Sequence, residues 1–310
     1  MKKIGITGSY GKTSVCEIIY QYLLKLGKTV VLYCTNGIFK NGKTINKNML
    51  TTSLPKIIIE KFLEKEDSEY AIIEIKGELF KTGKYIDLDI IGITNFDKEL
   101  VNNFDNNVVL YSNCKNKALH TGKISLVPEN LKDEFYYTKT YKYLDTFKDW
   151  NKHQVENISL AIAILKELDL YKLEVFPEIK IRGRYEKFGN IIVDTGWCGF
   201  EHIYPMYKEN KIKLIYVPIY PENISPAVKI YRDTAKPYLS KCEKIYVTSS
   251  TNERSFDYFR KNFLEENYEN VEYIKEHKDC LEKALKELKD DELLFIMARE
   301  YFREFRSYLK

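Results

Sequence analysis

The feature that most constrains this chain is a glycine-rich segment near its N-terminus, "GITGSYGKTS", which spans residues 5–14. Residues 3–7 are predicted to form a short strand, and residues 12–26 place apolar side chains at helical spacing. Gly8 and Gly11 permit backbone angles and a close approach to a ligand that a side chain would block. A glycine turn between a strand and a helix N-terminus favours an anion, because backbone amides and the helix dipole both attract negative charge.

The last residues of this segment indicate that the anion is a triphosphate. Lys12 is long enough to reach terminal phosphates, and the hydroxyl of Thr13 is placed to ligate Mg²⁺. We therefore predict a site for ATP and Mg²⁺, with nucleotide contacts from Gly8, Ser9, Tyr10, Gly11, Lys12, Thr13 and Ser14. The spacing G-x-x-G-K-[ST] is shorter than the standard phosphate-loop pattern, and the alternative interpretation is a solvated lysine after a glycine turn.

Strand and helix patterns alternate through both halves of the chain. Apolar, β-branched runs predict strands at 28–34, 70–75, 88–95, 189–195, 212–219, 243–250 and 292–298. Helical spacing is found at 54–65, 151–170, 225–239, 254–265, 277–288 and 299–309. Such alternation predicts an α/β fold with parallel sheets. We expect a phosphate-loop ATPase domain over residues 1–175, followed by a smaller Rossmann-like α/β domain over residues 176–310.

The composition argues against several classes of partner. The formal net charge is +4 over 310 residues, and lysine and glutamate are mixed along the chain, so no nucleic-acid partner is expected. The six cysteines form no C-x-x-C pair, which predicts free thiols in a reducing compartment and no zinc site. Because no long apolar run or signal-type N-terminus is present, we expect no membrane partner and a cytoplasmic location.

Two carboxylates, those of Glu74 and Asp194, stand at the ends of predicted apolar strands and are candidate ligands. Glu74 ends a predicted strand parallel to the phosphate-loop strand, at the carboxyl edge where ligands of open α/β sheets bind. Together with Thr13 it would form an oxygen-only site that suits Mg²⁺. Lys12 and Glu74 are accordingly the predicted catalytic residues. The alternative for Glu74 is a polar residue that only satisfies hydrogen bonds at a strand end.

Several segments, in their order, resemble the motifs of the Mur ligase family of ATP-dependent amide-forming ligases. "GITGSYGKTS" is similar to the family's G-[IV]-T-G-T-x-G-K-T-[ST], and "TTSLP" at 51–55 is similar to its T-T-x-x-P loop. "AIIEIKGE" resembles the E-V-S-S strand end, which puts Glu74 in the place of the magnesium-binding glutamate. "NKHQVENISLAIAI" resembles G-x-H-N-x-x-N-x-x-A-A, which implies adenine contacts from His153, Gln154 and Asn157. For Asn157 read alone, the alternative interpretation is a surface residue.

The C-terminal part carries further similar motifs. "RGRYEKFGNIIVDTGW" resembles G-R-x-E followed by a strand that ends in D-x-A-H, which implies that Arg184 contacts the nucleotide and that Asp194 holds its ribose. "YRDTAKPYLSKCEKIYVTSSTNER" is similar to the R-D-x-x-K-x-P helix and the next strand of the third family domain. The resemblance places Arg254 where related ligases bind the carboxylate of the incoming amino acid.

The chain also departs from the family pattern. It begins at the phosphate-loop strand, so we expect no N-terminal UDP-sugar domain and a substrate other than a UDP-muramoyl peptide. A protein partner that supplies a substrate-binding domain belongs to the same expectation. Asn95 matches N-x-x-x-D-H, but Glu99-Leu100 replaces Asp-His, which puts the family's second magnesium in doubt. Lys115 lies near the place of the family's carbamylated lysine, although its neighbours favour an ordinary surface lysine. Trp197 replaces the histidine of D-x-A-H.

The resemblance implies a reaction. A substrate carboxylate would attack the γ-phosphate of ATP to give an acyl phosphate, and an amine would then displace phosphate to give an amide. The expected substrates are a small-molecule carboxylate and a small amine, and the active site would lie between the two domains. The alternative is a catalytically diverged, nucleotide-binding partner or scaffold subunit of another enzyme.

Overall fold

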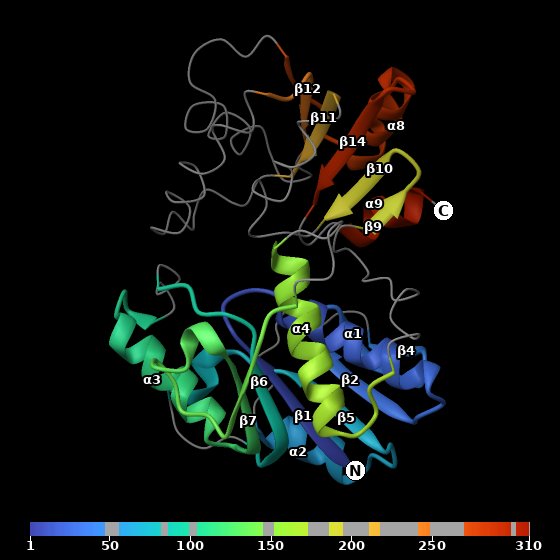
Figure 1. The fold of residues 1–310 in the computed structure, drawn as a ribbon. Helices are drawn as coiled ribbons and strands as arrows, with labels where there is room; N and C mark the ends of the chain where they lie inside the picture. Colours follow the sequence, from blue (N-terminus) through green and yellow to red (C-terminus); the bar gives the residue numbers. More distant parts are fainter. Residues whose placement is uncertain are drawn as a thin grey trace. The chain divides into compact units, whose positions relative to one another are not determined.

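The protein is described from a computed structural model over residues 1–46, 56–81, 86–98, 104–144, 152–172, 186–194, 211–217, 241–248, 270–298 and 302–309. The chain divides into two compact units, Met1–Lys180 and Ile181–Lys310, and each is described by itself (Figure 1). The expected domain boundary near Val175 lies outside the described residues, a short distance before this division.

The first unit is built on an eight-stranded sheet with the order β4-β3-β2-β5-β1-β6-β7-β8. Its strands are β1 (Lys2–Thr7), β2 (Val30–Cys34), β3 (Gly37–Lys40), β4 (Lys43–Asn46), β5 (Tyr70–Glu74), β6 (Leu88–Ile93), β7 (Gly122–Pro128) and β8 (Lys139–Tyr141). The neighbouring strands in the run β2-β5-β1-β6-β7-β8 pair in parallel. Beyond β2, the strands β3 and β4 continue the sheet with antiparallel pairing. The central strands are buried on both faces, which is why their sequences are almost continuously apolar.

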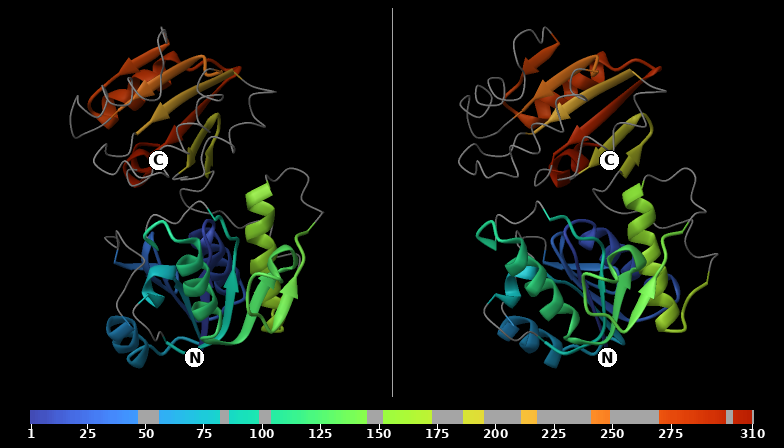
Figure 2. Two further views of the ribbon diagram at one scale, coloured as in Figure 1. Left: turned by 90° about the vertical axis from the view of Figure 1, so that its left-hand side faces the viewer. Right: turned by 60° about the vertical axis from the view of Figure 1, so that its left-hand side comes forward.

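Helices cover both faces of this sheet (Figure 2). They are α1 (Lys12–Lys25), α2 (Lys56–Glu64), α3 (Val108–Leu119) and α4 (Lys152–Glu167), with short 3₁₀ turns η1 (Gly77–Phe80) and η3 (Glu129–Leu131). Helices α2 and α3 pack on one face in a core with Ile73, Ile91 and Tyr111. Helix α4 packs on α1 and lies over the opposite face, where its Leu160 sits against the Cα of Gly92.

The second unit is a six-stranded sheet with the order β13-β12-β11-β14-β10-β9. Its strands are β9 (Glu186–Phe188), β10 (Ile191–Asp194), β11 (Lys211–Tyr216), β12 (Lys244–Val247), β13 (Val271–Tyr273) and β14 (Glu292–Met297). Only β9 is antiparallel to its neighbour among the described pairs. Helices α8 (His277–Glu287) and α9 (Phe302–Tyr308) contribute to its apolar core. This arrangement confirms the predicted Rossmann-like α/β fold.

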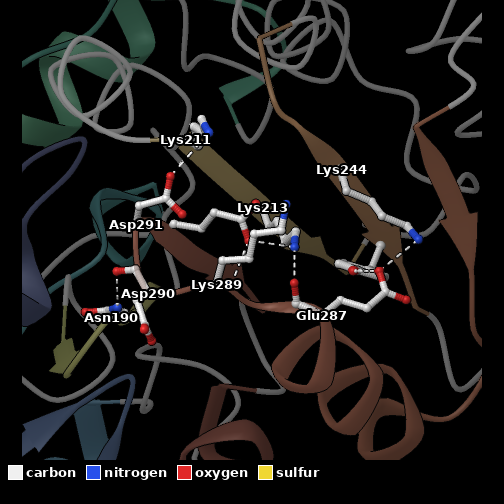
Figure 3. A network of polar contacts seen from close by, with 10 residues as sticks. Asn190, Lys211, Lys213, Lys244, Glu287, Lys289, Asp290 and Asp291 are labelled. Atoms are coloured by element: carbon white, nitrogen blue, oxygen red, sulfur yellow. Dashed lines mark hydrogen bonds and ion pairs between the residues drawn. The ribbon is translucent and has the colours of Figure 1, made fainter.

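A network of polar contacts joins the first residues of the central strands β11, β14 and β12 to the end of α8 (Figure 3). Lys213, which lies between two buried apolar residues of β11, donates to Glu292 Oε2 at 2.7 Å and to the carbonyl of Glu287 at the end of α8. Lys211 pairs with Asp291 at 3.2 Å, and Lys244 pairs with Glu287 at 3.1 Å. Lys213 and Glu292 are both buried, so this pair ties β11, β14 and α8 together inside the protein.

The predicted strands and helices that fall on described residues are confirmed, with bounds that differ by a few residues. The helices predicted at 225–239 and 254–265 lie outside the described residues. The hairpin of β3 and β4, helix α3 and strands β7 and β8 were not predicted. Within the part of the chain that is described, no helix is long and apolar enough to cross a membrane.

Candidate functional site

The glycine-rich segment forms a tight loop between β1 and α1 that only glycine allows. Gly8 has φ 138° and Gly11 has φ 78°, both in the region that favours glycine. A Cβ at Gly8 would lie 1.9 Å from Thr94 Oγ1, and a Cβ at Gly11 would lie 1.9 Å from Asn157 Oδ1. The loop therefore needs glycine at both positions for its backbone angles and for its packing.

The segment that follows β6 braces one side of this loop. The amide of Ser9 donates to the carbonyl of Asn95 at 3.1 Å, and the amide of Tyr10 donates to Asn95 Oδ1 at 2.9 Å. The hydroxyl of Tyr10 donates to Asp97 Oδ2 at 2.8 Å, and Ser9 Oγ accepts from the amide of Asp97 at 2.8 Å. Because these two amides already have partners, an anion would meet the first-turn amides of α1, which begin after Gly11.

The N-terminus of α1 is arranged to favour negative charge. Its N-cap residue, Gly11, provides no side-chain cap, and the first turn contains no acidic residue. The ammonium of Lys12 lies over the loop, where it donates to the carbonyls of Gly8 at 3.0 Å and Ser9 at 3.1 Å. The helix dipole and this lysine place two sources of positive potential at the same point.

Glu74 lies at the end of β5, beside β1, and is buried. Its Oε2 accepts from Thr13 Oγ1 at 3.0 Å and from the amide of Thr35 at 2.8 Å, and Thr35 Oγ1 lies 3.0 Å from both carboxylate oxygens. Since the Thr13 hydroxyl gives its proton to Glu74, its lone pairs are directed elsewhere and are available to a cation. The carboxylate is thus held in place by its neighbours. Its hydrogen bonds are satisfied, which is also what the alternative interpretation of Glu74, a polar residue that satisfies hydrogen bonds at a strand end, predicts.

Thr35 is the residue of this site that sequence reasoning missed. It follows β2, which pairs in parallel with β5, so the ends of the two strands meet at one edge of the sheet. The signal that would have found it is its place at the carboxyl end of a neighbouring buried strand, because no motif marked it.

Lys115 on α3 is part of the same cluster, and its interpretation as a surface lysine is wrong. The residue is 2% exposed. Its Nζ donates to Gly8 O at 2.9 Å and to Thr7 Oγ1 at 3.2 Å. Burial, followed by the charge of Lys12, holds the pKa of the Lys115 amine well below its usual value. The sequence alone does not indicate that α3 places Lys115 against the phosphate loop, because this contact depends on the tertiary packing of α3.

Asn157 on α4 is buried as well, so its interpretation as a surface residue is wrong. Its Oδ1 has no hydrogen-bond partner among the described residues, and it lies directly against Gly11. Buried amide oxygens are nearly always hydrogen-bonded in folded proteins. An acceptor without a partner beside the phosphate loop fits a site that a hydrogen-bond donor of a ligand would complete.

The remaining predicted site residues are only partly described. Asp194 ends β10 in the second unit and is buried. Outside the described residues lie Arg184, Trp197, Arg254, Glu99 and Leu100, together with the segment 51–55. Five cysteines are described, and all are buried free thiols, as predicted. Burial, with a smaller contribution from Glu74, raises the pKa of the Cys16 thiol, which disfavours its thiolate form.

No group of three or more His, Cys, Asp or Glu side chains suited to a metal ion occurs among the described residues. The donors at the loop are instead one carboxylate, Glu74, and two hydroxyls, those of Thr13 and Thr35. Such a set fits Mg²⁺, which takes one or two protein oxygens and completes its shell with phosphate oxygens and water.

Comparison with known proteins agrees with this geometry. Residues 6–76, which run from β1 past Glu74, match the Mur ligase middle domain. This part of the chain is therefore similar to the middle domain of the Mur ligases. The chain is 25% identical over 361 residues to a UDP-N-acetylmuramoyl-L-alanyl-D-glutamate–2,6-diaminopimelate ligase of Helicobacter hepaticus, a match that covers 96% of this chain and 74% of that protein. The ligase of the same name from Helicobacter pylori is 30% identical over 123 residues, which is 37% of this chain and 27% of the relative.

Solved structures share the fold across nearly the whole chain. A bifunctional folylpolyglutamate synthase/dihydrofolate synthase from Yersinia pestis, complexed with AMPPNP and a Mn ion, has a TM-score of 0.73 at 13% identity, and the match covers 99% of this chain and 88% of that one. A MurF ligase from Thermotoga maritima in complex with ADP has a TM-score of 0.66 at 15% identity, with coverage of 99% and 80%. The predicted fold class and family resemblance are confirmed.

Proposed function

We propose that this chain is a Mur-type, ATP-dependent ligase that joins a carboxylate to an amine through an acyl phosphate. The observation that carries the proposal is the hydrogen bond from Thr13 to the buried carboxylate of Glu74, next to the glycine loop that precedes α1. The names of its relatives, which are ligases, support the same reaction class. The match to the Helicobacter pylori relative spans 27% of that protein's length, so activity and substrates are proposals for this chain.

The first chemical step brings a substrate carboxylate against the triphosphate, and the barrier is repulsion between negative charges. Lys12 rests on the loop carbonyls and would turn to the terminal phosphates, while the first-turn amides of α1 bind their oxygens. Thr13 and Glu74 would hold Mg²⁺, which when bound neutralises phosphate charge and orients the γ-phosphate. Thr35 fixes the Glu74 carboxylate through its amide and its hydroxyl, so the metal ligand is preorganised.

The other nucleotide contacts follow from the buried groups near the loop and from the family resemblance. Asn157 Oδ1 would accept from a donor on the base, which would satisfy the partnerless oxygen. Asp194 and Arg184 are proposed to hold the ribose and a phosphate. Arg254 is proposed to bind the carboxylate of an amino-acid acceptor through a bidentate contact.

For the substrates, we propose a carboxylate that is not a UDP-muramoyl peptide and a small amine. The support is a difference in sequence: Leu100 and Trp197 stand where the family pattern has histidines, so the chain departs there from the pattern of the peptidoglycan ligases. A reducing, cytoplasmic compartment is proposed from the buried free thiols. A protein partner that contributes to substrate binding belongs to the same proposal.

The test is ADP release from MgATP, screened against panels of carboxylates and amines. A ligase releases ADP only when both substrates are present, and Glu74→Gln should lower that rate by at least tenfold at fixed Mg²⁺. Glu69→Gln is the matched control. The Glu69 carboxylate is exposed, it pairs with Lys28, and it lies just before β5, at the opposite end of that strand from Glu74. ADP release that ignores both substrates would contradict a ligase.

The second candidate function is a nucleotide-dependent scaffold or partner subunit. The replacement of both family histidines, by Leu100 and Trp197, favours it specifically. Tight MgATP binding without turnover in any pair of the screen, together with nucleotide-dependent binding to a protein partner, would select this function over the ligase.

A further inference from the structure

A buried carboxylate on α1 has no part in the proposed chemistry. Glu17 is fully buried, and it lies one helical turn after Thr13, so the two side chains share a face of the helix. A buried carboxylate is costly unless hydrogen bonds hold it, and it therefore occupies a fixed position. A group fixed one turn away from a proposed metal ligand is placed to hold other parts of the same site.

Glu17 contacts the turn that carries Thr35. The side-chain amide of Asn36 donates to Glu17 Oε1 at 3.4 Å. Cys34 and Gly37 are paired residues of β2 and β3, so Thr35 and Asn36 form a two-residue turn between these strands. Because so short a turn leaves its two residues little independent freedom, a shift of Asn36 would also displace Thr35.

The contacts of this turn close a ring of residues around the Glu74 carboxylate. Thr35 donates its amide to Glu74 Oε2 at 2.8 Å, and its hydroxyl lies 3.0 Å from both carboxylate oxygens. Thr13 donates to the same Oε2 at 3.0 Å. The members of the ring, in order, are Thr13, Glu74, Thr35, Asn36 and Glu17. Both ends of the ring lie on α1, so this helix fixes the carboxylate from two sides.

We propose that Glu17 is a positioning residue of the metal site, which acts through Asn36 and Thr35 to orient the Glu74 carboxylate toward a divalent cation. The inference rests on the proposed ATP and Mg²⁺ site. Residues that orient a metal ligand from behind typically change metal affinity by about 10–100-fold when they are replaced. Because Glu17 acts on the metal ligand and not on the nucleotide, its loss should weaken nucleotide binding only when the metal is present.

The same helix and the same hairpin offer a matched control. Tyr20, three residues after Glu17, is also buried, and its hydroxyl accepts from the amide of Gly42 at 2.8 Å. Gly42 lies in the turn between β3 and β4, at the other end of the hairpin from Asn36. Tyr20→Phe therefore removes a contact between α1 and the hairpin without touching the ring around Glu74.

The experiment is calorimetric titration of the full chain with AMPPNP, without metal and over a series of Mn²⁺ concentrations. Glu17→Ala should raise the Mn²⁺ concentration needed for half-maximal enhancement of binding about tenfold, and it should leave the metal-free AMPPNP affinity unchanged. Asn36→Ala should have the same effect, and the double variant should show no further loss, because the two residues act in series. Glu17→Gln keeps an acceptor oxygen for Asn36, so it should retain most of the wild-type metal affinity.

Tyr20→Phe should leave both quantities at their wild-type values. Thermal melts show whether each variant is folded, and Asn36→Ala, which breaks the same contact and keeps Glu17, tests the proposal even where Glu17→Ala does not fold. Wild-type Mn²⁺ dependence in Glu17→Ala or Asn36→Ala, an equal loss of affinity with and without metal, or a raised Mn²⁺ requirement in Tyr20→Phe would each overturn the proposal.

The failure of this proposal can be told apart from the failure of the proposed function. A wild type whose AMPPNP affinity does not rise with Mn²⁺ would overturn the metal site itself, and this proposal with it. Lost metal dependence in Glu74→Gln, together with wild-type behaviour of Glu17→Ala and Asn36→Ala, would overturn the positioning role of Glu17 alone.

Discussion

Replacing Gly11 with alanine should remove nucleotide binding. The cause would be a steric contact with Asn157, and its effect can be measured apart from that of backbone strain. Gly11 sits at φ 78°, and its missing Cβ would lie 1.9 Å from Asn157 Oδ1, on α4. Gly27 ends α1 at φ 73°, and a Cβ there would meet nothing within 4 Å. The two glycines thus have the same backbone demand, but only one has the steric contact.

The structure sets the size of the two effects. An L-residue in the left-handed region costs about 1–2 kcal/mol, so Gly27→Ala should lower the free energy of unfolding by that amount. Gly11→Ala carries the same backbone cost plus an overpacking cost of about 1–3 kcal/mol, because the buried Asn157 amide has to move. The total for Gly11→Ala is therefore about 2–5 kcal/mol.

The assay is urea unfolding combined with MgATP titration for both variants. Gly27→Ala should bind MgATP like the wild type, while Gly11→Ala should lose measurable binding even where it is folded. Adding Asn157→Ala to Gly11→Ala should recover the overpacking part of the lost stability, while the backbone cost remains, and it should not restore binding. Equal MgATP affinity in Gly11→Ala and the wild type would refute the assignment of this loop to the phosphates.

Four further outcomes are expected from the same geometry. Lys12→Ala should weaken MgATP binding by more than a hundredfold in calorimetry, because the charge over the loop is lost while the β1–α1 fold remains. Thr35→Val should raise the Mg²⁺ concentration needed for half-maximal nucleotide binding, and Thr35→Ser should restore it, since serine keeps the hydroxyl that contacts Glu74. Glu292→Gln should cost about 3–5 kcal/mol of unfolding free energy, because it leaves Lys213 buried without its counter-charge. Burial alone would raise the pKa of Glu292, but Lys213 and a backbone amide lower it overall. The stabilisation from this pair is therefore present above the unfolded-state pKa and is lost as the pH falls through the folded-state pKa. Chemical unfolding of the wild type at several acidic pH values measures this loss of stability, and a wild type that shows no such loss would contradict the pairing.

The loop and the position of Glu74 beside it could be predicted because their signals are local. Glycines at fixed spacing, a lysine and a hydroxyl at a helix start, and an acid after an apolar strand are all readable along the chain. The same apolar runs predicted that the strands β5, β1 and β6 pair in parallel. These elements are the ones whose physical cause lies within a few residues of sequence.

The residues that were missed or misread owe their place to tertiary contacts. Lys115 lies on α3, a helix whose sequence mixes polar and apolar residues without a clear stripe, and only its packing under the loop buries it. Thr35 reaches Glu74 because β2 pairs with β5, which are separated by a hairpin and a helix in sequence. Asn157 looks like any polar residue on an amphipathic helix until α4 is packed beside Gly11.

The most direct test of the central claim is the affinity of the wild-type chain for AMPPNP, with and without Mn²⁺, compared with Glu74→Gln. The account predicts that Mn²⁺ strengthens AMPPNP binding to the wild type at least tenfold, and that Glu74→Gln binds the nucleotide alone normally but gains little from the metal. The account would be contradicted by a wild type that does not bind AMPPNP, or by a Glu74→Gln variant that gains as much from Mn²⁺ as the wild type does.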